Sequence, residues 1–351
     1  MSRVACWRRV DATALSMTLW TLILLAWWLQ YEFRSMFIYE FFRKGTFKNG
    51  ILGWARIDAD DCAPSRRPPA RPTVDVLTSY WTAHPCMTNA NCSKLATAGA
   101  GQSTLYPHIW QSARANQEAA VHLLNISTYA VGGGELREFH GPGMHALCAK
   151  IRYVSTLLRN EVAEGHWLVL IDADAGFRCS ALCDESSAHN VSIASSHNNK
   201  RHRCAGLEEA LWRVSYAAWM RRRSDPSFLV FSAFGFFAVR NDAGMRSLFS
   251  SWVGAMETRP FMCLFSTVPD VAAFHEVYGD HGDAGDNAAR RCSLVYAPEI
   301  EQELVHHIAG QARKSDKAQV KRFTALLNRE SQCIRRRLEH GNAAGRRRDD
   351  T

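Results

Sequence analysis

The stretch His166-Trp-Leu-Val-Leu-Ile-Asp172-Ala-Asp174-Ala-Gly-Phe177 joins a run of apolar residues to two aspartates. The run from Leu168 to Ile171 predicts a buried β-strand. Burying one carboxylate is costly, and two close carboxylates also repel each other, so a cation between them would explain the pattern. Ligands bind at strand ends in open α/β sheets, and Mg²⁺ and Mn²⁺ prefer carboxylate oxygens. The stretch therefore predicts a divalent-metal site, although Asp-x-Asp also occurs where a strand simply ends in a turn.

Residues 12–31 carry no charge and include the run Leu-Trp-Thr-Leu-Ile-Leu-Leu-Ala-Trp-Trp-Leu. Twenty such residues are enough to cross a bilayer as a helix. Arginines precede the run, and Trp27-Trp28-Leu29 is a poor cleavage region because signal peptides are cleaved after small residues. We therefore expect residues 1–11 to be a cytosolic tail and residues 12–31 an uncleaved transmembrane signal anchor. The remaining chain would then lie in the lumen of the secretory pathway.

Two features of the remaining chain agree with a lumenal location. Asn-x-Ser sequons begin at Asn91, Asn125 and Asn190, and ten of the eleven cysteines follow the predicted anchor. An even number of cysteines in an oxidising compartment favours disulfides. The sequence thus predicts a glycosylated, disulfide-bonded protein. Taken singly, a sequon can occur by chance and a cysteine can simply be buried.

The composition divides the remaining chain into three parts. Residues 32–72 end in a proline-rich segment and predict a stem or linker. In residues 73–313, strands alternate with helices, which predicts one α/β domain with a mostly parallel sheet. Residues 314–351 predict a basic C-terminal helix and a tail that is disordered over 341–351. The predicted strands are 74–80, 135–139, 168–171, 228–239 (a strand or a hairpin) and 293–296, and the predicted helices are 111–124, 144–162, 207–220, 242–256 and 268–277.

The net charge of +8 comes largely from arginine, with local runs at 221–223, 335–337 and 346–348. Such runs can bind nucleic acid. A lumenal protein rarely meets nucleic acid, so we expect these runs to form solvated faces or to attract anionic donors and glycans. A membrane-tethered nucleic-acid-binding protein remains the alternative that the arginine runs leave open.

A second metal site is conceivable in the segment after the two aspartates. Cys179, Cys183, His197, His202 and Cys204 all have side chains that bind zinc. Zinc ligands usually come in tighter pairs, and oxidising compartments favour disulfides. Structural disulfides are therefore the preferred interpretation of these cysteines.

Several short segments between residues 74 and 310 form an ordered series. Residues 167–174 have the pattern Trp-x-x-x-x-Asp-x-Asp, and residues 307–310 read His-Ile-Ala-Gly. The other members are Thr78-Ser79-Tyr80, Ser127-Thr-Tyr-Ala130, Ala149-Lys150-Ile151, Gly235-Phe-Phe-Ala-Val-Arg240-Asn241 and Pro269-Asp270. The order and spacing resemble glycosyltransferase family 34, the galactosyl-, mannosyl- and xylosyltransferases of fungi and plants.

The resemblance implies a GT-A fold, a Rossmann-like sheet that binds a nucleotide-diphospho-sugar through a divalent ion. Asp172 and Asp174 would form the DXD motif that holds Mn²⁺ or Mg²⁺. His307, rather than His306, would be the third ligand; without the resemblance, a helix end or a packed imidazole would explain it. A divalent ion would stabilise the charge of the departing diphosphate as a Lewis acid.

Further residues are implied to contact the donor. Thr78 and Ser79 would bind the nucleotide-sugar. Lys150 and Arg240 would neutralise its diphosphate, with a surface salt bridge as the alternative for each. Asp270 would be the catalytic-site carboxylate beside the sugar, for sugar binding or electrostatic stabilisation, with helix capping as its alternative.

The expected function is that of a retaining hexosyl- or pentosyltransferase, a single-pass type II membrane protein of the Golgi or endoplasmic reticulum. Its donor would be a UDP- or GDP-sugar and its acceptor a glycan or glycoprotein hydroxyl. The chain departs from the family pattern at Ala233, Phe234 and Val271, which replace asparagine, alanine and glutamine. These positions line the implied sugar pocket, so a different donor is expected. The alternative is a non-catalytic lumenal homologue that binds glycan or a partner enzyme.

Overall fold

The computed structural model describes residues 16–26, 65, 67–81, 106–133, 146–182, 206–232, 235–258, 273–274, 277, 292–308 and 316–349. Its centre is a six-stranded sheet in the order β2-β1-β3-β6-β5-β7. The strands are β1 (Val74–Trp81), β2 (Thr128–Gly133), β3 (Trp167–Ile171), β5 (Phe228–Ser232), β6 (Phe236–Arg240) and β7 (Leu294–Tyr296). β6 pairs antiparallel with both of its neighbours, and the other pairings are parallel. The expected α/β fold with a mostly parallel sheet is therefore confirmed.

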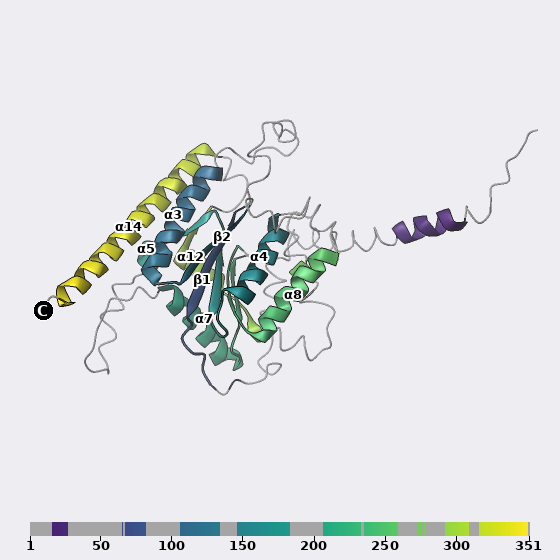
Figure 1. Ribbon diagram of the computed structural model, residues 1–351, viewed down its shortest axis with the longest axis horizontal. Helices are drawn as coiled ribbons and strands as arrows, with labels where there is room; N and C mark the ends of the chain where they lie inside the picture. Colours follow the sequence, from purple (N-terminus) through teal and green to yellow (C-terminus); the bar gives the residue numbers. More distant parts are fainter. Residues whose placement is uncertain are drawn as a thin grey trace, which may run out of the picture.

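Helices cover both faces of the sheet (Figure 1). The first face packs against α4 (Ala146–Asn160) and α8 (Ala243–Thr258). The second packs against α3 (Tyr106–Leu124), α7 (Gly206–Arg222) and α12 (Pro298–Leu304). All five residues of β3 are buried and alternate between the two cores. The continuous apolar run in the sequence is thus explained by a strand that is covered on both sides.

A two-stranded sheet extends from the carboxyl end of β3. β4 (Ala175–Phe177) follows β3 after a short turn and pairs antiparallel with β8 (Val305–His307). In this pairing Ala175 lies opposite His307, and α5 (Cys179–Leu182) follows directly. The pairing brings a segment from late in the chain next to the turn that contains the two aspartates.

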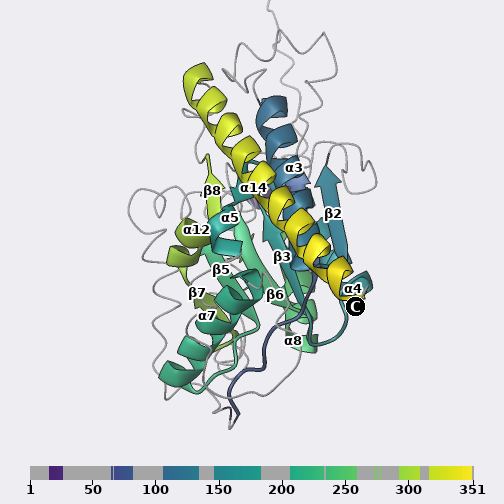
Figure 2. The ribbon, with the colours of Figure 1, turned by 90° about the vertical axis from the view of Figure 1, so that its left-hand side faces the viewer.

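The C-terminal helix α14 (Lys317–Asp349) packs along α3 over the same face of the sheet (Figure 2). Leu327 and Ile334 are fully buried, and a disulfide joins Cys333 to Cys179 of α5. The prediction of a disordered tail from residue 341 is wrong as far as Asp349, because the helix continues through it. Alanine and arginine, which dominate residues 343–348, are strong helix formers and outweigh Gly341 and Gly345.

The remaining element predictions can be compared one by one. The segment 228–239 is a hairpin that turns at Gly235, and Asp242 caps α8 by accepting the Met245 N–H at 2.8 Å. Asn125 ends α3 in the left-handed conformation, with φ 55°, which frees the chain to form β2. The predicted strand 135–139 and most of the predicted helix 268–277 lie outside the described residues.

Of the predicted membrane anchor, residues 16–26 are described; they are helical and exposed. Within the described ranges, no helix is both long enough and apolar enough to span a membrane. The other residues of the predicted anchor, and the predicted stem up to residue 64, lie outside the described residues.

Candidate metal centre

Three metal-binding side chains meet at the carboxyl end of β3. Asp172 and Asp174 lie in the turn between β3 and β4, and His307 is the last residue of β8. His307 Nε2 lies 3.4 Å from Asp174 Oδ1 and 3.9 Å from Asp172 Oδ2. One ligand atom from each residue can be chosen so that all lie within 4.8 Å of one another. The fold therefore brings together the three residues for which metal binding is predicted.

The spacing and chemistry of this cluster suit a hard divalent ion. Two ligands on opposite sides of Mg²⁺, each at about 2.1 Å, are about 4.2 Å apart, so the observed distances leave room for an ion after small adjustments. Carboxylates suit Mg²⁺ and Mn²⁺, and one imidazole among them shifts the preference toward transition metals. Three protein ligands would also leave positions open for the oxygens of a substrate.

Carboxylates surround the imidazole of His307. Its Nδ1 lies 2.7 Å from Glu301 Oε1, on α12, and this contact directs Nε2 toward the aspartates. Burial by itself lowers the pKa of His307, but hydrogen bonds to Asp174 and Glu301 and the charges of Asp174 and Asp172 raise it to about 10. A cluster that retains a proton so firmly has a negative potential that also attracts metal cations.

This imidazole predicts how the stability of the metal-free protein depends on pH. The pKa of His307 is raised above its ordinary value of 6.5, so its stabilising contribution is complete below about pH 6.5 and is lost as the pH rises through about 10. Urea unfolding in the presence of a chelator should therefore show the free energy of unfolding falling across this range. His307→Gln should flatten the profile, and an unchanged slope in that variant would contradict the assignment.

Lys150 completes the charged group from the other face of the sheet. It projects from α4, its side chain is 5% exposed, and its Nζ lies 3.9 Å from Asp172 Oδ1. A buried ammonium requires a negative partner, because desolvation otherwise disfavours its charge. Lys150 therefore forms a salt bridge, as its alternative expected, but a largely buried one with Asp172. Its contact with a bound diphosphate stays a prediction.

Gly235 lies against the first aspartate. Its carbonyl accepts the Asp172 N–H at 2.6 Å. A Cβ atom at this position would overlap Asp172 Oδ2 and lie 2.9 Å from Asp172 Cγ. A glycine is therefore needed at this turn for close packing against the carboxylate.

Arg240 lies at the end of the strands opposite to Asp172 and Asp174, which corrects the expectation that it neutralises the diphosphate. It pairs in register with Trp167, at the start of β3, whereas Ile171 precedes the aspartates. Four residues of strand separate these two ends by about 13 Å. The Arg240 guanidinium instead donates to Asp225 Oδ2 and Ser227 Oγ, each at 2.7 Å.

Thr78 and Ser79 lie in β1 with fully buried side chains. Thr78 pairs in register with Leu170, so both residues are near the carboxyl end of the sheet. Their predicted contact with a donor stays a prediction. Four further positions of the predicted sugar pocket lie outside the described residues: Ala233, Phe234, Asp270 and Val271.

The described cysteines support the disulfide interpretation. Cys179 is bonded to Cys333, and Cys148 and Cys292 are also in disulfides. Cys179 is therefore not a zinc ligand. The other residues of the alternative zinc site lie outside the described residues.

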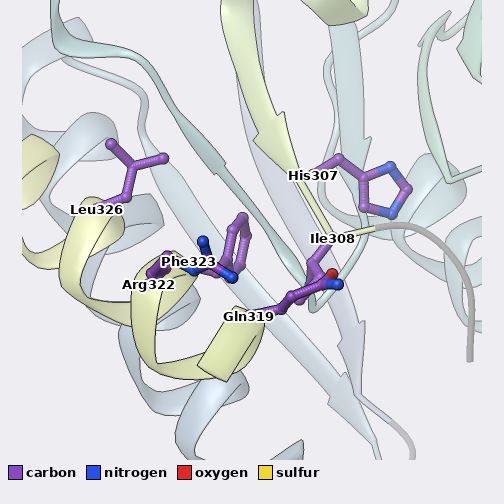
Figure 3. Close-up of a pocket in the computed structure, with 6 residues that line it drawn as sticks. All are labelled: His307, Ile308, Gln319, Arg322, Phe323 and Leu326. Atoms are coloured by element: carbon purple, nitrogen blue, oxygen red, sulfur yellow. The ribbon is translucent and has the colours of Figure 1, made fainter. Parts of the chain in front are cut away.

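A hollow of about 300 Å³ lies beside the metal cluster, between β8 and α14. Figure 3 shows the His307 ring turned away from Arg322 and Phe323, which come from the helix. The hollow thus adjoins the cluster through His307, which belongs to both. Its lining residues are His307, Ile308, Gln319, Arg322, Phe323 and Leu326.

The site also includes polar residues that the sequence-based reasoning missed. Asn116 and Gln117, in the middle of α3, are fully buried and bond to the backbone of β4 and of the turn that contains Asp172 and Asp174. Glu301 was likewise not predicted. Two adjacent amides in a helical segment with alanines at 113, 115, 119 and 120 were a detectable signal, because buried amides require partners.

No known protein-family model matches the chain, and no curated protein matches it. Among solved structures, the chain is similar to the crystal structure of a glycosyltransferase involved in the glycosylation of the major capsid of PBCV-1. The TM-score is 0.37 and the identity 9%, over 73% of this chain and 100% of the other. A similarity at this level does not transfer an activity, so the function is argued from the site.

Proposed function

We propose that the protein is a metal-dependent glycosyltransferase that moves a sugar from a nucleotide-diphospho-sugar to a glycan hydroxyl. The observation that carries this proposal is the cluster of Asp172, Asp174 and His307 beyond β3. Ligands of open α/β sheets bind at this edge, and diphosphates commonly bind proteins through a divalent ion. The ordered segments that resemble glycosyltransferase family 34 and its GT-A fold support the same assignment.

The residues of the cluster and its neighbours would have separate roles in metal binding and charge stabilisation. Asp172, Asp174 and His307 would hold Mn²⁺ or Mg²⁺, and Glu301 keeps the His307 ring oriented. When bound, the ion would act as a Lewis acid toward the leaving diphosphate. Lys150 would add a fixed positive charge on the other side of Asp172. The resemblance supplies the retaining stereochemistry, in which the acceptor hydroxyl attacks from the face that the diphosphate leaves.

The cellular setting is proposed from the sequence together with two features of the fold. Disulfides such as Cys179–Cys333 favour an oxidising compartment. The sequon residue Asn125 is exposed at the end of α3, as a glycosylated asparagine must be. We therefore propose a lumenal catalytic domain held at the Golgi or endoplasmic reticulum membrane by the N-terminal segment, with UDP- or GDP-sugars as donors, glycoproteins or glycans as acceptors, and no nucleic-acid partner.

A non-catalytic homologue that binds glycan or assists a partner enzyme is the second candidate. The substitutions at Ala233, Phe234 and Val271 favour it, because they fall in the implied sugar pocket. Such a protein would keep the metal cluster but would release no nucleotide.

A screen of UDP- and GDP-sugars tests the first proposal against the second. With the purified full chain and Mn²⁺, we expect at least one donor to be hydrolysed slowly to free sugar and nucleoside diphosphate, because water can replace the acceptor. A chelator should stop the reaction, and added Mn²⁺ should restore it. Metal-dependent donor binding detected by calorimetry, with no hydrolysis of the donor and no transfer to any glycan tested, would support the non-catalytic homologue. The absence of both binding and hydrolysis would contradict the first proposal.

A further inference from the structure

The turn that contains Asp172 and Asp174 is held by a side chain from α3. Gln117 Nε2 donates to the Asp172 carbonyl at 3.1 Å and to the Ala175 carbonyl at 2.7 Å. Gln117 thus ties together the two ends of the segment whose side chains form two-thirds of the metal cluster. Because Ala173, Asp174 and Ala175 are each 2% exposed, water has little access to replace these bonds.

The orientation of the Gln117 amide is itself determined by a neighbour. Tyr129, on β2, donates its hydroxyl proton to Gln117 Oε1 at 2.7 Å, which directs the amide nitrogen toward the two carbonyls. Burial raises the pKa of Tyr129 above its ordinary value, so the hydroxyl stays protonated and remains a donor. Ser79 Oγ lies 3.4 Å from the same hydroxyl, which connects β1 to this network.

Asn116 makes the equivalent connection one residue earlier in α3. Its Nδ2 donates to the Phe177 carbonyl at 3.1 Å, and its Oδ1 accepts the Phe177 N–H at 2.5 Å. A Cβ atom on Gly176 would lie 2.8 Å from Asn116 Oδ1, so β4 is packed directly against the amide. α3 therefore fixes the turn through Gln117 and the strand that follows through Asn116.

We infer that Gln117 is a positioning residue of the metal centre, which sets the relative placement of the Asp172 and Asp174 carboxylates through the backbone of their turn. Gln117 contacts the backbone of the ligand residues and acts through it, so it need not touch the metal or the substrate. The inference rests on the proposed metal-dependent function. It predicts that the affinity for the ion depends on this amide and on the tyrosine that orients it. Partners of ligand residues typically change metal affinity by about 10- to 100-fold.

Calorimetric titration of the full chain with Mn²⁺ alone tests this inference. Gln117→Met keeps the length of an unbranched side chain but removes all three hydrogen bonds, and we expect the Mn²⁺ affinity to fall by at least about tenfold. Tyr129→Phe removes one hydroxyl and leaves the Gln117 donors in place, so a smaller loss of affinity is expected. Ser331→Ala is the control, because Ser331 is also buried and its hydroxyl donates to the Leu327 carbonyl of its own helix.

The variants must be compared at known stability, so thermal unfolding is measured with a chelator for each. Loss of Mn²⁺ affinity in Gln117→Met beyond that of the control, after allowance for the fraction folded, supports the inference. Wild-type affinity in a folded Gln117→Met variant overturns it. If that variant does not fold, Tyr129→Phe decides the matter: reduced affinity supports the inference and unchanged affinity overturns it. Failure of the wild-type protein to bind Mn²⁺ would instead refute the proposed metal-dependent function.

Discussion

Replacing Asp172 and Asp174 together with asparagine is expected to abolish Mn²⁺ binding and to lower the rate of donor hydrolysis by at least about a hundredfold. The amides preserve side-chain shape but remove two negative charges from the cluster. Stabilisation of a leaving diphosphate by a metal contributes several kcal/mol, and a loss of about 2.7 kcal/mol already corresponds to a hundredfold in rate. Calorimetry with Mn²⁺ and nucleotide release measured under saturating donor check the two effects separately.

The matched control removes two carboxylates from the opposite edge of the sheet. Asp75 pairs with His166, and Asp225 pairs with Arg240, both remote from the cluster in register. Asp75→Asn combined with Asp225→Asn should leave Mn²⁺ affinity within a factor of about two, since interactions at distant sites are usually independent. Full activity in the Asp172→Asn, Asp174→Asn variant would refute the proposed function, and an equal loss in the control would point to general destabilisation.

Gly235→Ala is expected to weaken Mn²⁺ binding by at least about tenfold, even though it adds a single methyl group. The new Cβ atom would occupy the space of Asp172 Oδ2, so the carboxylate must rotate or the β5–β6 turn must move. Crowding a packed site in this way also typically costs about 1–3 kcal/mol of stability. Mn²⁺ titration and urea unfolding of the same preparation separate the two consequences.

Gly254→Ala provides the comparison for that substitution. A Cβ atom on Gly254, in the last third of α8, would meet no atom outside its own helix within 4 Å. The change should leave Mn²⁺ affinity unaltered and should stabilise the helix by up to about 1 kcal/mol, because alanine is the better helix former. Equal Mn²⁺ affinity in Gly235→Ala and Gly254→Ala would show that the Asp172 carboxylate does not need its present position.

The turn that contains Asp172 and Asp174 was predictable because its features are local in the sequence. The run of apolar residues before Asp172 has one economical explanation, a strand covered on both faces, and the two aspartates follow it directly. His307 is different, because its role depends on the pairing of β4 with β8, and periodicity in one segment does not reveal such a pairing. The resemblance to a family supplied what the local pattern lacked.

The error at Arg240 has a specific physical origin. The resemblance implied that Arg240, at the end of an apolar strand, lies near the diphosphate, as Asp172 does at the end of β3. β6, however, returns through a tight hairpin and runs antiparallel to β3, so its last residue lies at the opposite edge. The direction of a strand depends on its pairing in the sheet. A charged residue that ends an apolar strand can therefore lie at either end of the sheet, and the local pattern does not say which.

Gln117 and Glu301 could not be assigned from the sequence for a related reason. Gln117 binds backbone carbonyls and Glu301 binds a histidine on the following strand, and no residue pattern marks those partners. A buried amide shows that a partner exists, but the fold is needed to say which one. The residues that support the candidate metal centre were thus harder to predict than its proposed ligands.

The pairing of β4 with β8 has a consequence for how the protein is made. Chains are synthesised from the N-terminus, and the turn with the two aspartates leaves the ribosome well before residues 305–307 and before Glu330, which contacts His306. Until then the nascent chain contains Asp172 and Asp174 without His307, and Cys179 cannot form its disulfide because Cys333 has not been synthesised. The order of translation therefore delays assembly of the centre, so that an unfinished chain cannot acquire the full ligand set.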